Sequence, residues 1–75
     1  MYSGDIVIHI DENLDDGHIR DLELGLSREQ GVYKASMHEK RRHLLVVDYD
    51  PDRVEPGHIV QSVREHGLHA EMINF

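Results

Sequence analysis

Asp15 and His18 stand three residues apart in the segment 13–18, which reads Asn-Leu-Asp-Asp-Gly-His. The residues before this segment alternate like a strand and those after it repeat like a helix, so a strand-to-helix turn is expected here. Residues three apart at a helix start lie on one side, where a carboxylate oxygen and an imidazole nitrogen can face one ion. Such donors suit Zn²⁺, Ni²⁺ or Co²⁺ rather than Cu(I). The spacing therefore predicts a candidate site for a divalent metal.

A purely structural role would use the same residues. Aspartate is a favoured N-cap and an acidic side chain complements the helix dipole, so Asp15 and Asp16 can simply start the helix. His18 would then be a solvent-exposed residue of the first turn. The residue pattern leaves the metal-binding and the capping interpretations open.

The composition describes one small acidic domain over residues 1–75. Eight basic and fifteen acidic residues give a net charge of −7 with the histidines neutral, which argues against nucleic acid and anionic membrane surfaces as partners. The longest apolar run, 44–47, is far too short to insert across a membrane, and no signal peptide is visible. The absence of cysteine fits a cytoplasmic location and rules out disulfides and thiolate metal sites. The seven histidines make the charge sensitive to pH near about pH 6.

Hydrophobic periodicity predicts six elements. The expected elements are a strand over 5–10, a helix over 15–29, strands over 32–38 and 43–49 that form a hairpin, a helix that begins near Pro56 and stops at Gly67, and a strand over 68–75. Tyr33 is expected on the same face as Ala35 and Met37, in the core or at its rim. This βαββαβ order predicts an α+β, ferredoxin-like sandwich, with two helices on one face of a four-stranded antiparallel sheet.

The predicted topology places most of the potential metal-binding side chains at one end of the molecule. Three connections, 11–18, 39–42 and 66–69, are expected to meet there, and six of the seven histidines lie at or near them. Further metal donors are expected from this end: His69 or His66 as a third ligand beside Asp15 and His18, and Glu12 or Asp11 as a further oxygen. This convergence follows from the predicted fold, since these residues are far apart in the sequence.

Three short motifs stand out: Gly31-Val32 after the first helix, Tyr49-Asp50-Pro51 after the third strand, and Gly67-Leu68-His69-Ala70-Glu71 near the end. Together with the βαββαβ order, they resemble heavy-metal-associated domains, the fold of small copper chaperones and of modules of metal-pumping P-type ATPases. The resemblance places the family's metal-binding Cys-x-x-Cys on Asp15-Asp16-Gly17-His18, where both cysteines are absent. Asn13 stands where a methionine usually precedes the motif, and Leu68 where an aromatic residue is common. Because Cu(I) needs thiolates, copper(I) chaperone activity is not carried over.

Two functions follow as hypotheses. The first is a cysteine-free module that binds or delivers a divalent transition metal (Zn, Ni or Co) in metal transport or homeostasis, with a metal-transporting ATPase or other transporter as partner. The second is a metal-free protein-interaction or regulatory module that kept the fold and lost the metal site. It would dock through its acidic, histidine-rich end or through a sheet face carrying Val7, Leu44 and Val46, to a partner or as a homodimer. A ligand-binding regulatory domain, as in amino-acid-sensing modules, is a more distant third.

Other motifs add less. Lys40-Arg41-Arg42 is either a docking patch or a solvated hairpin tip, and His38-Glu39 with His43 is either a second metal site or a group of surface bystanders. No nucleophile is arranged with a histidine and an acid, and no glycine-rich phosphate loop is present, so the chain is not expected to be an enzyme.

Overall fold

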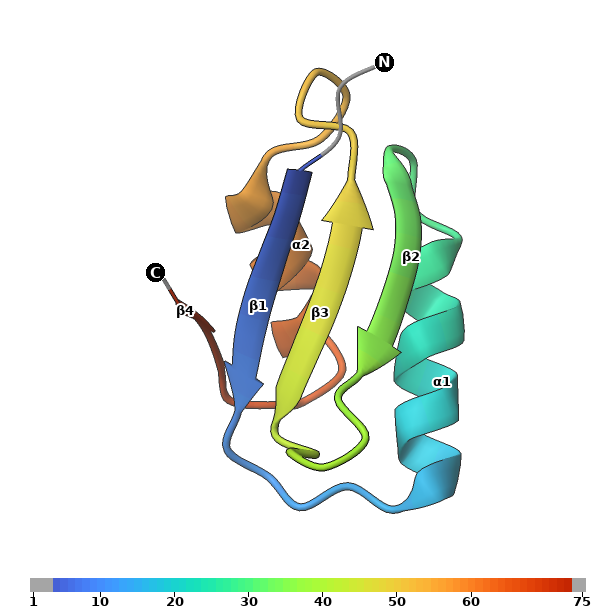
Figure 1. The fold of residues 1–75 in the computed structure, drawn as a ribbon, viewed down its shortest axis with the longest axis vertical. Helices are drawn as coiled ribbons and strands as arrows, with labels where there is room; N and C mark the ends of the chain where they lie inside the picture. The colour runs from blue at the N-terminus through green and yellow to red at the C-terminus, as the bar shows by residue number, and fades with distance from the viewer. Residues whose placement is uncertain (1–3, 74–75) are drawn as a thin grey trace.

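The computed structural model describes residues 4–73 and contains the six expected elements in the expected order. Their bounds are β1 Gly4–Ile10, α1 Asp16–Ser27, β2 Val32–Met37, β3 Leu44–Tyr49, α2 Pro56–Arg64 and β4 Ala70–Ile73. The strands form one antiparallel sheet in the order β2-β3-β1-β4. Both helices cover one face of this sheet and leave the other face open (Figure 1). The ferredoxin-like βαββαβ sandwich is therefore confirmed.

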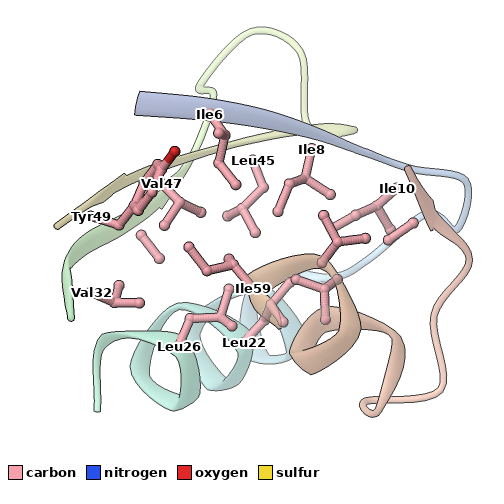
Figure 2. Close-up of a cluster of buried hydrophobic side chains, with 14 of the residues drawn as sticks. Ile6, Ile8, Ile10, Leu22, Leu26, Val32, Leu45, Val47, Tyr49 and Ile59 are labelled. Carbon is pink, nitrogen blue, oxygen red and sulfur yellow. The ribbon is translucent and has the colours of Figure 1, made fainter. Parts of the chain in front are cut away.

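The core lies between the sheet and the two helices. Alternate residues of the central strands point into it, Ile6, Ile8 and Ile10 from β1 and Leu45, Val47 and Tyr49 from β3. Figure 2 shows these side chains meeting residues of the two helices across the layer. The helical contribution comes from the apolar stripes that the sequence predicts: Ile19, Leu22 and Leu26 of α1 and Ile59, Val60 and Val63 of α2. A single apolar layer therefore fixes the orientation of both helices.

One sequence-based expectation about β2 is wrong. Tyr33 does not share a face with Ala35 and Met37, because the pairing of β2 with β3 shifts by one residue between Val32 and Lys34. This irregularity buries Val32 and turns Tyr33 outward, where it is 48% exposed. The Tyr33 hydroxyl donates a long hydrogen bond (3.4 Å) to Asp50 Oδ2. The β2 edge therefore presents an aromatic ring to solvent.

Element ends differ from expectation by a few residues. α1 ends at Ser27 instead of Glu29, and β4 covers Ala70–Ile73 within the expected 68–75. Leu68 lies in the turn before β4 and packs against the core. The last two residues of the expected strand, 74–75, lie outside the described residues.

The three predicted connections do meet at one end of the molecule. The β1–α1 loop, the β2–β3 hairpin and the α2–β4 turn all lie at the lower end of the view in Figure 1. Backbone hydrogen bonds join them, from Ile10 N to His43 O (2.8 Å) and from Asp11 N to His69 O (3.0 Å). Within residues 4–73, no helix has the length and apolar character needed to cross a membrane.

Candidate functional site

Asp15 is the N-cap of α1. Its backbone is extended (φ −79°, ψ 173°), and its Oδ1 accepts a hydrogen bond of 2.8 Å from the backbone N–H of His18. This backbone hydrogen bond, together with one from the His18 side chain, lowers the pKa of the Asp15 carboxyl. The capping interpretation of Asp15 is therefore confirmed.

The Asp15 carboxylate also orients the His18 ring. His18 Nδ1 lies 2.8 Å from Asp15 Oδ1, and the His18 side chain is 72% exposed. A carboxylate oxygen only accepts hydrogen bonds, so in the neutral ring Nδ1 carries the proton and Nε2 has the lone pair. A carboxylate behind an imidazole in this way holds the ring and raises its basicity as a metal ligand. The pair thus presents one ready nitrogen donor at the start of α1.

His69 lies at the same end of the molecule as Asp15 and His18, but its side chain pairs with Glu12. The Glu12 carboxylate accepts from the His69 backbone N–H at Oε1 (2.9 Å) and lies 2.6 Å from His69 Nδ1 at Oε2. The side-chain hydrogen bond is the main cause that lowers the pKa of Glu12 and raises that of His69. Glu12 and His69 therefore fasten the β1–α1 loop to the α2–β4 turn, and this Glu12–His69 clasp is separate from the Asp15–His18 pair.

His66 shares a cavity with His18. His66 Nδ1 lies 2.9 Å from the Ser62 carbonyl oxygen, which only accepts, so in the neutral ring Nδ1 carries the proton and Nε2 the lone pair. The cavity measures about 150 Å³ and is lined by Leu14, His18, Asp21, Leu22, His66 and Leu68. The structure thus places two of the six candidate ligands, His18 and His66, around one cavity. Asp21 was missed by the sequence reasoning, although its position three residues after His18 would have flagged it.

The donor set can be compared with the needs of a metal. Cu(I) does not fit, because the chain has no cysteine and the site offers imidazole nitrogen and carboxylate oxygen. Zn²⁺, Ni²⁺ and Co²⁺ accept these donors. Among residues 4–73, no group of three or more histidine, aspartate and glutamate side chains is placed to hold an ion. The described residues therefore contain no complete set of protein ligands for an ion.

Polar side chains of the β2–β3 hairpin at this end already have partners within the chain. His38 Nδ1 accepts from the backbone N–H groups of Lys40 (3.2 Å) and Arg41 (3.1 Å), so it helps to form the turn. Arg42 pairs with Asp16 at the start of α1. His43 stacks on His9 of β1, with ring centroids 5.8 Å apart, and does not join His38. The basic tip is thus partly neutralised by an acidic neighbour.

The fold matches those of several solved structures. A copper-binding domain from HMA7, a P-type ATPase, superposes with a TM-score of 0.83 at 23% identity, covering 93% of each chain. The apo form of a copper chaperone of Enterococcus hirae gives a TM-score of 0.80 at 25% identity, covering 91% of this chain and 98% of that one. Oxidized MerP from Ralstonia metallidurans gives 0.84 at 11% identity, covering 97% of this chain and all of the other.

No protein-family model matches the chain, and no curated protein matches it in sequence. The structural neighbours confirm the fold that the resemblance to heavy-metal-associated domains implies, here in a chain without cysteine.

Proposed function

We propose that this chain is a cysteine-free metal-binding module that carries a divalent transition metal, Zn²⁺, Ni²⁺ or Co²⁺. His18 and His66 are the metal ligands, each through Nε2. The observation that carries the proposal is that these two rings line one cavity and that each has its Nδ1 held by a hydrogen-bond acceptor. Two imidazoles that line one cavity are the first requirement of a nitrogen-donor site.

The other predicted ligands support these two. Asp15 acts behind His18 as the acceptor that orients its ring. Glu12 and His69 hold the two loops together, which sets the separation of His18 and His66. Each would join the coordination shell only if the Glu12–His69 clasp opened.

An incomplete shell suits a carrier of exchangeable metal. Two protein ligands leave positions on a tetrahedral ion for water or for donors from another protein. The neighbours described as a copper chaperone and as a domain of a P-type ATPase support a role in delivery, with a metal-transporting ATPase or other transporter as receiver. In this proposal the chain is a cytoplasmic carrier without enzymatic activity.

The proposal is tested by calorimetric titration with Zn²⁺ near neutral pH. We expect one saturable site in the wild-type chain. His18→Ala and His66→Ala should each weaken it by about tenfold or more, because each removes one of two protein ligands. His58→Ala is the matched control, since His58 is exposed on α2 away from this cavity. Zn²⁺ affinity unchanged in the double variant His18→Ala/His66→Ala would contradict the proposal.

A metal-free interaction module is the second candidate. It is favoured by the fact that the carboxylates of Glu12 and Asp15 already have partners within the chain. The same titration separates the two functions, because this candidate predicts no saturable binding of Zn²⁺, Ni²⁺ or Co²⁺. The acidic, histidine-rich end would then contact a protein partner directly.

A further inference from the structure

The sheet has two edge strands, β2 and β4. Within residues 4–73 each of them pairs with a neighbouring strand on one side only, as the order β2-β3-β1-β4 requires. The backbone groups of alternate residues point away from the paired strand, so an edge presents N–H and C=O groups to any strand that approaches. A second copy of the chain brings such a strand. An edge that is not blocked therefore favours edge-to-edge pairing between copies.

The backbone groups of Ala35 and Met37 face the free edge of β2. The N–H of His38, directly after β2, donates to the carbonyl oxygen of Leu44 on the β3 side (2.8 Å), which fixes the alternation. Ser36 has the same orientation as His38, so its backbone groups also face β3. Ala35 and Met37 alternate with these two residues and point the other way. The β2 edge thus offers the N–H and C=O groups of two residues for further pairing.

One of these outward groups already has a partner from α1. Glu23 Oε2 accepts a hydrogen bond of 2.8 Å from the backbone N–H of Met37. α1 lies beside β2 (Figure 1), and Glu23 reaches from this helix to the strand edge. A carboxylate accepts a stronger hydrogen bond than a peptide carbonyl does. An approaching strand would therefore have to break this hydrogen bond and leave the Glu23 carboxylate without its partner.

The rest of the β2 edge carries two further features that oppose strand pairing. The pairing of β2 with β3 shifts between Val32 and Lys34, so the strand is irregular at this end. Lys34 is exposed and places a charge on the edge strand. Irregularities and lysines are common on natural edge strands because they hinder the approach of another strand. Glu23 adds a block at the opposite end of β2, where the pairing with β3 is regular.

A similar arrangement exists at the other edge of the sheet. The N–H of Asp11 donates to the carbonyl oxygen of His69 (3.0 Å), so the backbone of His69 faces the β1 side. Ala70 is the next residue, and its backbone therefore faces the free edge of β4. Arg64 Nε of α2 donates to the Ala70 carbonyl oxygen (3.0 Å). Each helix thus sends one charged side chain to the edge strand beside it, and each side chain matches the backbone group that it meets.

We propose that Glu23 is an edge-blocking residue, which keeps the β2 edge of this chain from pairing with the β2 edge of a second copy. The unblocked edge would be self-complementary. With a two-fold axis at Ser36, the outward groups of Ala35 in one copy meet those of Met37 in the other, twice, in an antiparallel ladder. The Met37 N–H is one of the donors in that ladder, and Glu23 occupies it. The inference does not rest on the proposed function.

The test measures self-association of the whole chain by analytical ultracentrifugation, from micromolar to millimolar concentration at neutral pH, with a metal chelator present. Glu23→Ala removes the acceptor, which opens the Met37 N–H to a second strand. Its dimer should have a dissociation constant at least about tenfold lower than that of wild type. Glu23→Gln removes the same charge but keeps an acceptor oxygen, so it should associate like wild type.

Asp15→Ala is the matched control for charge and stability. It also removes one carboxylate that accepts from a backbone N–H, that of His18, but at the start of a helix instead of at a sheet edge. This variant should associate like wild type. Circular dichroism checks that every variant is folded.

Amide hydrogen exchange locates the contact. In dilute Glu23→Ala, the Met37 amide should exchange faster than in wild type, because its acceptor is gone. At high concentration of this variant, the amides of Ala35 and Met37 should both become protected, because both enter the ladder. The Ser36 amide faces β3 and should not change with concentration, so it is the internal control.

Three results would overturn the inference. The first is a folded Glu23→Ala variant that stays as monomeric as wild type at millimolar concentration. The second is association of Glu23→Gln or Asp15→Ala as strong as that of Glu23→Ala, which would assign the effect to charge or to stability. The third is association of Glu23→Ala without added protection of the Ala35 amide, which would assign it to another surface. Each result leaves the Zn²⁺ titration of the His18 and His66 site unaffected, so the two proposals fail separately.

Discussion

At the scale of single residues, Asp15 has two roles. Its Oδ1 caps α1 through the backbone N–H of His18 and also holds the His18 ring at Nδ1. The sequence presented these roles as alternatives, metal-site residue or helix cap. In the structure one oxygen atom serves the cap and the ring together, so the capping role supports the proposed metal ligand.

Substitution at this position separates the two roles. Asp15→Ala should lower the free energy of unfolding by about 1 kcal/mol, because the cap is lost. It should also weaken Zn²⁺ binding by about 10- to 100-fold, because the His18 ring is no longer held. Asp15→Asn keeps a good cap and should retain most of the stability with a smaller loss of affinity. Chemical denaturation and Zn²⁺ calorimetry check both numbers, and an Asp15→Ala variant that binds Zn²⁺ like wild type would remove Asp15 from the site.

At the scale of elements, α1 contains a destabilising glycine beside the candidate site. Gly25 lies inside this helix, where glycine costs about 1 kcal/mol relative to alanine. A Cβ at Gly25 would lie 3.1 Å from His66 Nε2, so the missing side chain leaves room for the imidazole. The close approach of the His66 ring therefore explains why residue 25 has no side chain.

Gly25→Ala should change stability and metal binding in opposite directions. The free energy of unfolding should rise by up to about 1 kcal/mol, because alanine is a better helix former than glycine. The exposed His66 ring can move aside, so the new methyl group causes no lasting clash. Zn²⁺ affinity should fall, because the ring leaves its position in the cavity. Gly57→Ala on α2 is the matched control, since its Cβ would meet nothing within 4 Å. Thermal unfolding and calorimetry measure both effects, and an unchanged affinity in Gly25→Ala would speak against His66 as a ligand.

The Glu12–His69 clasp makes the joining of two loops depend on pH. The pKa of His69 is raised from its ordinary 6.5, so its stabilising effect is full below that value and is lost as the pH rises through the folded-state pKa. The pKa of Glu12 is lowered from 4.5, so its effect is full above that value and is lost as the pH falls through the folded-state pKa. The clasp is therefore strongest between pH 4.5 and 6.5.

Glu12→Gln should test this window. The melting temperature of wild type should exceed that of the variant most between these two pH values, and the difference should shrink on either side. His58→Gln, which changes a histidine outside the clasp, should not reproduce this profile. A difference that is constant with pH would mean that the Glu12–His69 contact does not titrate as described.

Two glycines with positive φ differ in their surroundings. Gly31 (φ +89°) lies directly before β2, and a Cβ there would lie 2.9 Å from Val54 Cγ1. At Gly67 (φ +82°), a Cβ would meet nothing within 4 Å. Gly67→Ala should therefore lower the free energy of unfolding by about 1 kcal/mol, from backbone strain alone. Gly31→Ala should cost about 1–3 kcal/mol more, because it also crowds Val54. Equal losses in urea denaturation would contradict the difference in packing.

At the scale of the whole molecule, the fold could be predicted because its signals are periodic. Alternation in Ile6, Ile8 and Ile10 and the helical spacing of Ile19, Leu22 and Leu26 identify both the elements and their buried faces. Connection lengths then leave few topologies, so the end that gathers the three loops follows from the sequence. The register shift at Tyr33 was missed, because it depends on how β2 pairs with β3 and leaves no mark on the local pattern.

The sequence predicted at which end of the molecule the candidate ligands lie, but not which side chains pair with one another. The sequence placed Asp15, His18, His66, His69 and Glu12 at one end, and the structure agrees. It could not show that Glu12 binds His69 or that His18 and His66 line one cavity. Such choices depend on side-chain distances of a few ångströms between loops that are remote in sequence. The free Nε2 atoms follow only from those partners.

The most direct measurement of the central claim is a histidine-ring ¹H–¹⁵N NMR spectrum recorded during a Zn²⁺ titration near neutral pH. Without metal, His18 and His66 should show the tautomer protonated at Nδ1, as their acceptors require. On addition of Zn²⁺, we expect saturable shifts at Nε2 of these two rings, while His58 stays unchanged. Diffuse shifts across all seven histidines, or no shift at His18 and His66, would contradict a metal site at this end.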